Sequence, residues 1–200
     1  MQEQTAKAII LKKNKYSESD LIVQFITQSG EKFSAIARGA LRSKKRFAGG
    51  ILEPTHYIEI HFKKSQDHKL SVLLEAQMID DFHKIRQSYD HIQLALHFVE
   101  CVQKVSQEGD SGSANLYNLL GHSLKTLQEV KNLRKFRLHF HVKFLHQQGI
   151  LETEPWMFDF IKTSIMQSDD IKISDIDLAK YGKFSEESVR NYISRAERGY

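Results

Sequence analysis

Five short segments in the first eighty residues carry the residue pattern of β-strands. Apolar, β-branched and aromatic residues dominate each segment, and glycine or polar residues that favour turns lie between them. No stretch of helical periodicity of convincing length separates them. They span residues 8–11, 21–27, 32–38, 57–62 and 70–78. Because so many strands must pair within so short a stretch, we expect a small closed β-barrel, and the OB-fold is the leading candidate.

Beyond residue 80, apolar residues recur at intervals of three and four, which is the period of amphipathic α-helices. Ser88 can cap the first of these helices, and a row of leucines within 116–127 predicts a second. Residues 136–144 alternate as a strand would, but the length of the segment 133–149 and its apolar residues on two sides favour a central, buried helix. A last amphipathic helix is expected to begin at Ser185.

These patterns predict an α+β protein of two domains. Residues 1–80 would form an OB-fold domain that binds nucleic acid, and residues 81–200 would form an α-helical domain that binds partners. The net charge is +4, but residues 1–64 contain twelve Lys and Arg against six Asp and Glu, and the rest of the chain carries −2. A basic first third is typical of a module that binds a polyanion.

Five of these twelve basic residues lie in one segment, 37–50, which also holds three glycines. No acidic residue lies between Glu31 and Glu53. Lys and Arg neutralise phosphates, and glycine lets the backbone approach them closely. The segment therefore predicts a contact with a nucleic-acid backbone, and a solvated surface loop is the alternative.

Aromatic rings near this segment could add stacking on bases. Tyr57 lies on the opposite side of its strand from Ile58 and Ile60, so it is the better candidate for an exposed ring. Phe47 adjoins the basic run and could lie either in the core or on the surface. The expected nucleic-acid-binding residues are Arg38, Arg42, Lys44, Lys45, Arg46, Phe47 and Tyr57.

Several other kinds of site are not expected. Cys101 is the single cysteine, which excludes an internal disulfide framework and a multi-cysteine metal cluster. His139 and His141 would lie on different faces of a helix, so we expect no metal centre. No phosphate-loop or dinucleotide-binding glycine pattern is present, and we expect no cofactor and no catalytic residues. Without a long apolar run or a signal peptide, we place the chain in the cytoplasm.

Five short motifs stand in the order and spacing of a known family. They are Tyr16-Ser-Glu-Ser-Asp-Leu-Ile-Val23, Ala37-Arg-Gly-Ala40, Ser43-Lys-Lys-Arg-Phe-Ala-Gly49, Leu52-Glu-Pro54 and Leu73-Leu-Glu75. The chain resembles the RecO family of bacterial recombination mediator proteins, specifically over about residues 6–80 and more weakly over 81–150. The resemblance implies an OB-fold followed by a helical domain.

The resemblance also implies a function. A RecO-like protein would be a non-enzymatic, nucleoid-associated DNA repair protein that binds single- and double-stranded DNA. It would anneal complementary strands coated with single-strand binding protein and, with RecR, promote the loading of RecA.

A partner site follows from the same resemblance. Basic residues at Arg134 and Lys135, with Arg137 close by, would line an apolar pocket for the acidic C-terminal tail of single-strand binding protein. A guanidinium pairs with a carboxylate, and the pocket would bury the last apolar residue of the tail. The alternative is that these are solvated charges at a helix N-terminus, where the helix dipole disfavours cations.

The chain departs from the family in its C-terminal part. Many members carry a four-cysteine zinc ribbon there, which this chain cannot form with Cys101 alone. The resemblance therefore gives residues 152–200 no role. Two other functions stay open: an OB-type RNA-binding protein, and a metal-dependent nuclease that uses acidic pairs such as Asp80 and Asp81.

Overall fold

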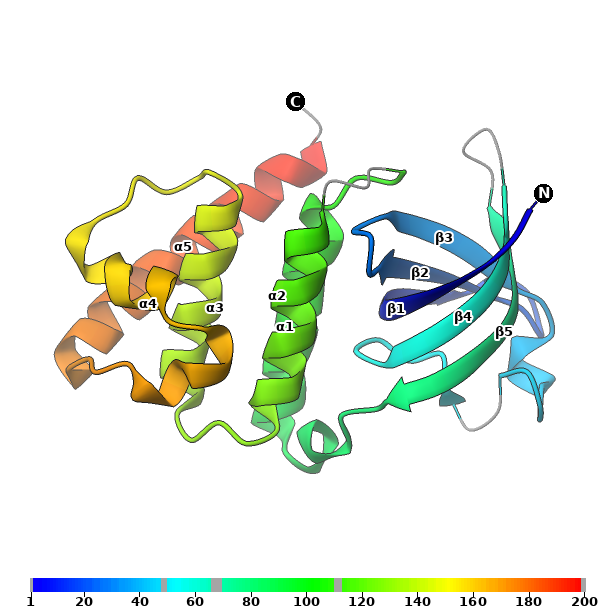
Figure 1. The fold of residues 1–200 in the computed structure, drawn as a ribbon, viewed down its shortest axis with the longest axis horizontal. Helices are drawn as coiled ribbons and strands as arrows, with labels where there is room; N and C mark the ends of the chain where they lie inside the picture. The colour runs from blue at the N-terminus through cyan, green and yellow to red at the C-terminus, as the bar shows by residue number, and fades with distance from the viewer. Residues whose placement is uncertain (1, 48–49, 66–69, 110–112, 199–200) are drawn as a thin grey trace. The chain divides into compact units, whose positions relative to one another are not determined.

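The computed structural model describes residues 2–47, 50–65, 70–109 and 113–198 (Figure 1). The chain divides into two compact units. The barrel unit contains Met1–His83 and Ser106–Tyr117, and the helical unit contains Lys84–Val105 and Asn118–Tyr200. Residues 106–117, which follow the first long helix, thus belong to the barrel unit. The predicted single boundary after residue 80 does not include this segment in the barrel domain.

Five strands build the barrel unit. They are β1 (Gln2–Lys15), β2 (Leu21–Thr27), β3 (Lys32–Ala37), β4 (Tyr57–Lys64) and β5 (Ser71–Asp80). The strand order is β1-β2-β3-β5-β4, and antiparallel pairing of β4 with β1 closes the barrel. The pairing of β3 with β5 is parallel, and the other pairings are antiparallel. The predicted fold class, an OB-like β-module followed by helices, is confirmed.

Alternation along the strands fills the barrel. Ile58, Ile60 and Phe62 of β4 point inward and are buried, and the ring of Phe62 stacks on Phe33 with centroids 4.7 Å apart. β1 is much longer than the predicted segment 8–11, because its first half pairs with β4 and its second half with β2. Most of the residues outside 8–11 are exposed, so the apolar pattern marked only the buried middle of the strand.

The helices follow the barrel in the chain. The α-helices are α1 (Tyr89–Val105), α2 (Ala114–Leu127), α3 (Leu133–Gln147), α4 (Phe158–Lys162) and α5 (Asp175–Arg198). Short 3-10 helices are η1 (Ala40–Arg42), η3 (His83–Gln87), η4 (Pro155–Met157) and η5 (Ile165–Asp170). None of the helices in the described ranges has both the length and the apolar character that a membrane span requires.

α3 is the central helix of the helical unit, as its two apolar sides predicted. Phe140 stacks on Phe98 of α1 with ring centroids 3.8 Å apart. On the other side, Leu138 and Val142 join a buried cluster with Phe160 of α4. The segment forms a helix despite its strand-like alternation, because each of the two apolar sides of α3 packs against a different apolar partner.

The last helix, α5, begins ten residues earlier than predicted. The Ser174 hydroxyl caps it by accepting a hydrogen bond from the Asp177 N–H at 3.1 Å. Ser185, the predicted first residue, is instead buried within the helix. Gly182 also lies inside α5, where glycine is normally unfavourable, but the helix continues through it. Ile193 is buried, as expected for the apolar side of an amphipathic helix.

Gly30 offers a test of the contact between the β2–β3 turn and the returning segment. Its φ is +87°, and a Cβ atom there would lie 2.2 Å from the backbone nitrogen of Ala114. We predict that Gly30→Ala lowers the free energy of unfolding by about 2–5 kcal/mol, from left-handed strain and overpacking together. Urea denaturation of the purified chain measures this loss.

Gly109 provides the matched control. Its φ is +80°, but apart from Gly109 and its two neighbours in the chain, no described atom lies within 4 Å of the position that a Cβ atom would take. Gly109→Ala should cost only the backbone strain, about 1–2 kcal/mol. Equal losses in the two variants would contradict the close contact at Gly30.

Candidate nucleic-acid interface and partner pocket

The basic loop begins where β3 ends, and the β1–β2 turn holds it. The Gly39 N–H donates a hydrogen bond to Asp20 Oδ1 at 2.8 Å, and this bond lowers the pKa of the Asp20 carboxyl. The Leu41 N–H donates to the Ser19 carbonyl oxygen at 3.0 Å. Two contacts from one turn therefore fix the start of the loop and the helix η1.

The far end of the loop is also fastened. The Phe47 N–H donates to Ser43 Oγ at 3.2 Å, and the Ala76 N–H of β5 donates to the Arg46 carbonyl oxygen at 3.2 Å. Arg46 Nη2 reaches back to the Arg38 carbonyl oxygen at 3.0 Å. The described part of the loop is therefore held at both ends.

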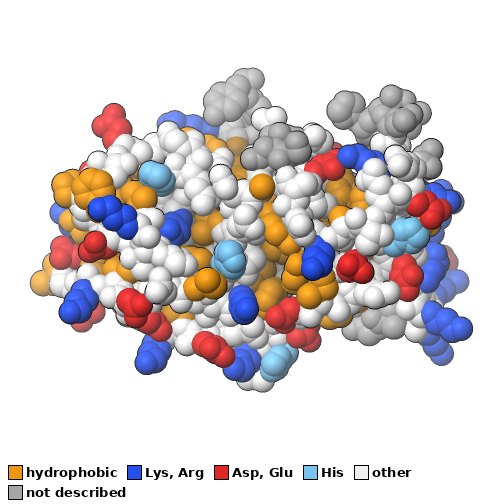
Figure 2. Space-filling model, in the orientation of Figure 1, with side chains coloured by type: hydrophobic (Ala, Val, Ile, Leu, Met, Phe, Trp, Pro, Cys, Tyr) orange, Lys and Arg blue, Asp and Glu red, His pale blue; other side chains and the backbone are white. Residues whose placement is uncertain are grey.

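The predicted cations are all exposed on this loop; they are Arg38, Arg42, Lys44, Lys45 and Arg46. Arg42 and Glu18 form a loose, strongly exposed pair at 3.7 Å. Lys44 and Lys45 form no ion pair with any residue that the structure describes. The loop is light blue and lies at the right of Figure 1. Figure 2, in the same orientation, shows Lys and Arg side chains gathered along the right edge. These charges are available to a polyanion.

The two predicted aromatic contacts are less available. The Phe47 side chain is only 4% exposed and packs in the barrel core, so its ring cannot stack on a base. The Phe47 ring is therefore buried in the core, although the basic residues that precede it are exposed. Tyr57 is half-buried and meets the edge of Tyr117 with ring centroids 6.5 Å apart. Burial and the neighbouring Tyr57 raise the pKa of Tyr117.

A pocket of about 280 Å³ lies between α3 and α5 at the predicted partner site. Its cationic and apolar lining includes Arg134, Arg137, Lys183, Leu138 and Leu178. Glu186 also lines it and pairs with Arg137 at 2.6 Å. The pocket thus combines cations with apolar side chains, and one acid is already engaged by a cation.

Lys135 differs from its neighbours. Its Nζ donates to the carbonyl oxygens of Asp169 and Ile171, at 2.8 and 3.0 Å, and so ties the end of η5 to α3. Adjacent residues of a helix point in different directions, about 100° apart. Arg134 and Arg137 therefore line the same pocket, whereas the Lys135 side chain binds two backbone carbonyl oxygens outside it.

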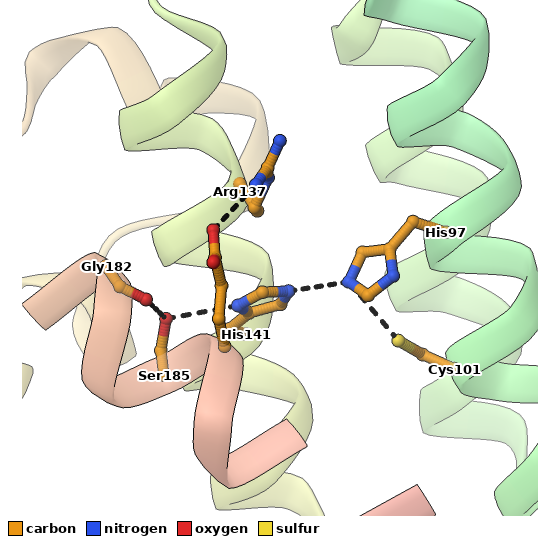
Figure 3. Close-up of polar contacts among 7 residues, drawn as sticks. His97, Cys101, Arg137, His141, Gly182 and Ser185 are labelled. Atoms are coloured by element: carbon orange, nitrogen blue, oxygen red, sulfur yellow. Dashed lines mark hydrogen bonds and ion pairs between the residues drawn. The ribbon is translucent and has the colours of Figure 1, made fainter. Parts of the chain in front are cut away.

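His97 and His141 line a second pocket of the helical unit, of about 420 Å³, and they belong to a polar network that the sequence did not reveal (Figure 3). Ser185 Oγ donates to the Gly182 carbonyl oxygen at 2.9 Å and lies 3.1 Å from His141 Nδ1. Because the hydroxyl hydrogen is used, His141 Nδ1–H must donate to Ser185. His141 Nε2 then accepts from His97 Nε2–H, 2.8 Å away. Burial lowers the pKa of both histidines, which agrees with this neutral chain of bonds.

Cys101 lies beside this network, with its Sγ 3.7 Å from His97 Nε2. Burial raises the pKa of the Cys101 thiol to about 12, so the sulfur is a poor nucleophile. Within the described ranges, no group of three or more His, Cys, Asp or Glu side chains is placed to hold a metal ion.

The acidic pair considered for a nuclease has a local structural role. Asp80 Oδ1 accepts from the Phe82 N–H at 2.7 Å, and Asp81 Oδ1 accepts from the His83 N–H at 3.0 Å. These bonds stabilise the turn that follows β5. No observation on the described residues favours metal-dependent cleavage.

Residues 1–82 match the family model described as Recombination protein O N terminal. The DNA repair protein RecO of Syntrophus aciditrophicus (strain SB) is 35% identical over 143 residues, which are 72% of this chain and 54% of that protein. The chain belongs to the RecO family. The DNA repair protein RecO of Desulfosudis oleivorans (strain DSM 6200 / JCM 39069 / Hxd3) is 33% identical over 148 residues, or 73% of this chain and 56% of that protein. The chain thus spans little more than half the length of these RecO relatives.

The RecO-like motifs have a physical reason to occur together. Residues 16–23 contain Asp20, whose carboxylate binds Gly39 in the motif 37–40. Arg46, in the motif 43–49, donates a hydrogen bond to the Arg38 carbonyl oxygen, which also belongs to the motif 37–40. Three of the five motifs, which are separate in the chain, therefore meet around the basic loop.

Buried histidines make the stability of the helical unit depend on pH. His139 Nε2 lies within hydrogen-bond distance of the carbonyl oxygens of Phe160 and Thr163, and burial, with Lys143 nearby, lowers the pKa of His139 to about 4. The unfolded chain takes up this proton first, so stability is full above about pH 6.5 and is lost as the pH falls toward 4. Each such histidine contributes a slope of about 1.4 kcal/mol per pH unit.

Urea denaturation at pH 7, 6 and 5 measures this slope. His139→Gln keeps a donor for the Phe160 carbonyl and should have a shallower dependence than the unchanged chain. His122→Gln, at an exposed position of α2, should keep the full slope. A His139→Gln curve parallel to that of the unchanged chain would show that His139 is not the titrating group.

Proposed function

We propose that this chain is a DNA-binding protein of the recombination-mediator type that acts without catalysing a covalent step. It would bind single- and double-stranded DNA and anneal complementary strands coated with single-strand binding protein. The observation that carries this proposal is the exposed basic loop, fastened to a barrel that matches the RecO family. The relatives are named DNA repair proteins.

The mechanism would be electrostatic. Lys44, Lys45 and Arg42 would replace counterions on the phosphates, which favours binding to any sequence. Two complementary strands repel each other through their phosphates. A surface that neutralises part of this charge would let their bases meet without an energy source.

The pocket between α3 and α5 would bind a protein partner. The carboxylates of the acidic tail of single-strand binding protein would pair with Arg134 and Arg137, and the terminal apolar residue would lie against Leu138 and Leu178. Arg137 already forms an ion pair with Glu186, so it would have to bind Glu186 and a carboxylate of the tail at the same time. Together with RecR, the complex would then promote the loading of RecA on the exposed strand.

The salt dependence of DNA binding tests the loop. Arg42→Ala, Lys44→Ala and Lys45→Ala together should flatten the plot of log affinity against log salt by about 2, because each single-strand contact contributes roughly 0.7. Arg46 is left in place because it holds the Arg38 carbonyl. The same variant should anneal coated complementary strands more slowly than the unchanged protein.

A variant with the same loss of charge elsewhere is the control: Lys125→Ala, Lys131→Ala and Lys172→Ala, all exposed in the helical unit. It should keep the slope and the annealing rate. An unchanged slope in the loop variant would remove the loop as the DNA site. A failure of the unchanged protein to anneal coated strands, or a strong preference for ribose strands, would count against the proposed function itself.

The partner pocket makes a separate prediction. Arg134→Ala should weaken binding of a synthetic acidic peptide that ends in phenylalanine by about tenfold, because a charge-assisted hydrogen bond is lost. Lys135→Ala should leave this affinity nearly unchanged and instead lower stability, since Lys135 binds two backbone carbonyls. Fluorescence anisotropy of a labelled peptide measures the affinity.

A peptide with its acids replaced by amides is the control and should bind weakly to all variants. Equal losses of affinity for Arg134→Ala and Lys135→Ala would contradict the division of roles between these neighbours. No loss for Arg134→Ala would remove the pocket as the tail site.

A further inference from the structure

We infer that Tyr16 and Leu41 are the base-contacting residues of the nucleic-acid surface. Tyr16 would stack on an unpaired base, and Leu41 would make an apolar contact beside it. The inference rests on the proposed function and deepens it, because it assigns to this surface a preference for unpaired bases.

Exposure singles out these two side chains. Tyr16 is 61% exposed and Leu41 is 51% exposed, whereas Phe47 of the basic loop is 4% exposed. Tyr57, the other aromatic candidate, is partly covered by Tyr117. Base stacking requires an open aromatic face, and Tyr16 provides one next to the basic loop.

The backbone around Tyr16 is held in place. The Tyr16 N–H donates to the Asp20 carbonyl oxygen at 2.9 Å, and Ser17 Oγ accepts from the Asp20 N–H at 3.1 Å. The turn is therefore tight, and a base that stacks on Tyr16 would not have to order the backbone first. This turn joins the first two strands, and in OB-folds the loop at this position is one that contacts oligonucleotides.

The same turn positions Leu41. The Ser19 carbonyl oxygen accepts from the Leu41 N–H at 3.0 Å, and Asp20 Oδ1 accepts from the Gly39 N–H. The segments that carry Tyr16 and Leu41 are thus bonded directly to each other. The two exposed side chains therefore belong to segments, the β1–β2 turn and η1, that are hydrogen-bonded to each other.

Each of the two residues has an exposed cation next to it in the chain. Lys15 precedes Tyr16 and Arg42 follows Leu41, and both are exposed. The pair of Arg42 with Glu18 is 3.7 Å long and strongly exposed, so a phosphate can compete for Arg42. Apolar side chains between cations match single-stranded nucleic acid, in which bases alternate with phosphates. Duplex DNA would offer the phosphates but would keep its bases stacked on one another.

Binding to two oligonucleotides of equal length and charge tests the inference. One is an oligothymidylate, and the other is an abasic strand with the same phosphates. Tyr16→Ser should weaken binding to the oligothymidylate by about tenfold and leave binding to the abasic strand unchanged. Tyr16→Phe keeps the ring and should behave as the unchanged protein. Leu41→Ala should show a smaller loss in the same direction.

The controls are exposed residues of the same type in the helical unit. Tyr89 is 76% exposed and Leu96 is 44% exposed, so Tyr89→Ser and Leu96→Ala should change neither affinity. Thermal unfolding of each variant checks that the barrel is intact. The slope of log affinity against log salt should stay the same in Tyr16→Ser, because no phosphate contact is removed.

The outcomes separate this inference from the proposed function. If Tyr16→Ser binds the oligothymidylate as tightly as the unchanged protein, or loses equal affinity for both strands, Tyr16 does not stack on bases and the inference is overturned. If the unchanged protein binds neither strand in a salt-dependent manner, the proposed function fails and the inference fails with it.

Discussion

The hydrogen bond from the Gly39 N–H to the Asp20 carboxylate is the contact on which the candidate DNA surface depends. It joins the β1–β2 turn to the start of a loop whose cations would otherwise repel one another. Arg38 adds a favourable charge interaction with the same carboxylate. Asp20 thereby anchors the loop from its base, while the cations of the loop stay exposed. Asp20, an acid next to the basic loop, therefore has a structural role: it holds the loop that carries the cations.

The helical unit depends on α3 in a comparable way. A helix with apolar side chains on two sides can be covered only if other helices pack against both, and the few polar groups it buries must then be paired inside. His141 meets this condition as a neutral donor and acceptor, whereas His139 meets it only at Nε2, which lies within hydrogen-bond distance of the Phe160 carbonyl oxygen, and its buried Nδ1 has no partner among the described residues. The same burial that keeps them uncharged makes the unit sensitive to acid. The pocket that carries Arg134 opens on the side of α3 where α5 lies.

The sequence predicted most elements because burial leaves a period in the chain. Where burial is one-sided or sparse, the prediction was incomplete. Only the buried middle of β1 was predicted, and the prediction for α5 missed residues 175–184, of which only Leu178 is buried. The site was harder to predict. Phe47 and Lys135 stand next to cations in the chain, but the barrel core and two backbone carbonyls determine where they point. Direction depends on contacts with distant segments, which no local pattern records.

The balance between single and double strands follows from the two kinds of contact. Each phosphate contact releases more counterions from a duplex than from a single strand, so cations such as Lys44 and Lys45 alone would favour the duplex. An annealing protein with such a bias would hold its product. A contact that only an unpaired base can make, as Tyr16 would provide, favours the separate strands and is lost when the bases pair. Stacking at the β1–β2 turn would therefore help the surface both to collect single strands and to release the duplex they form.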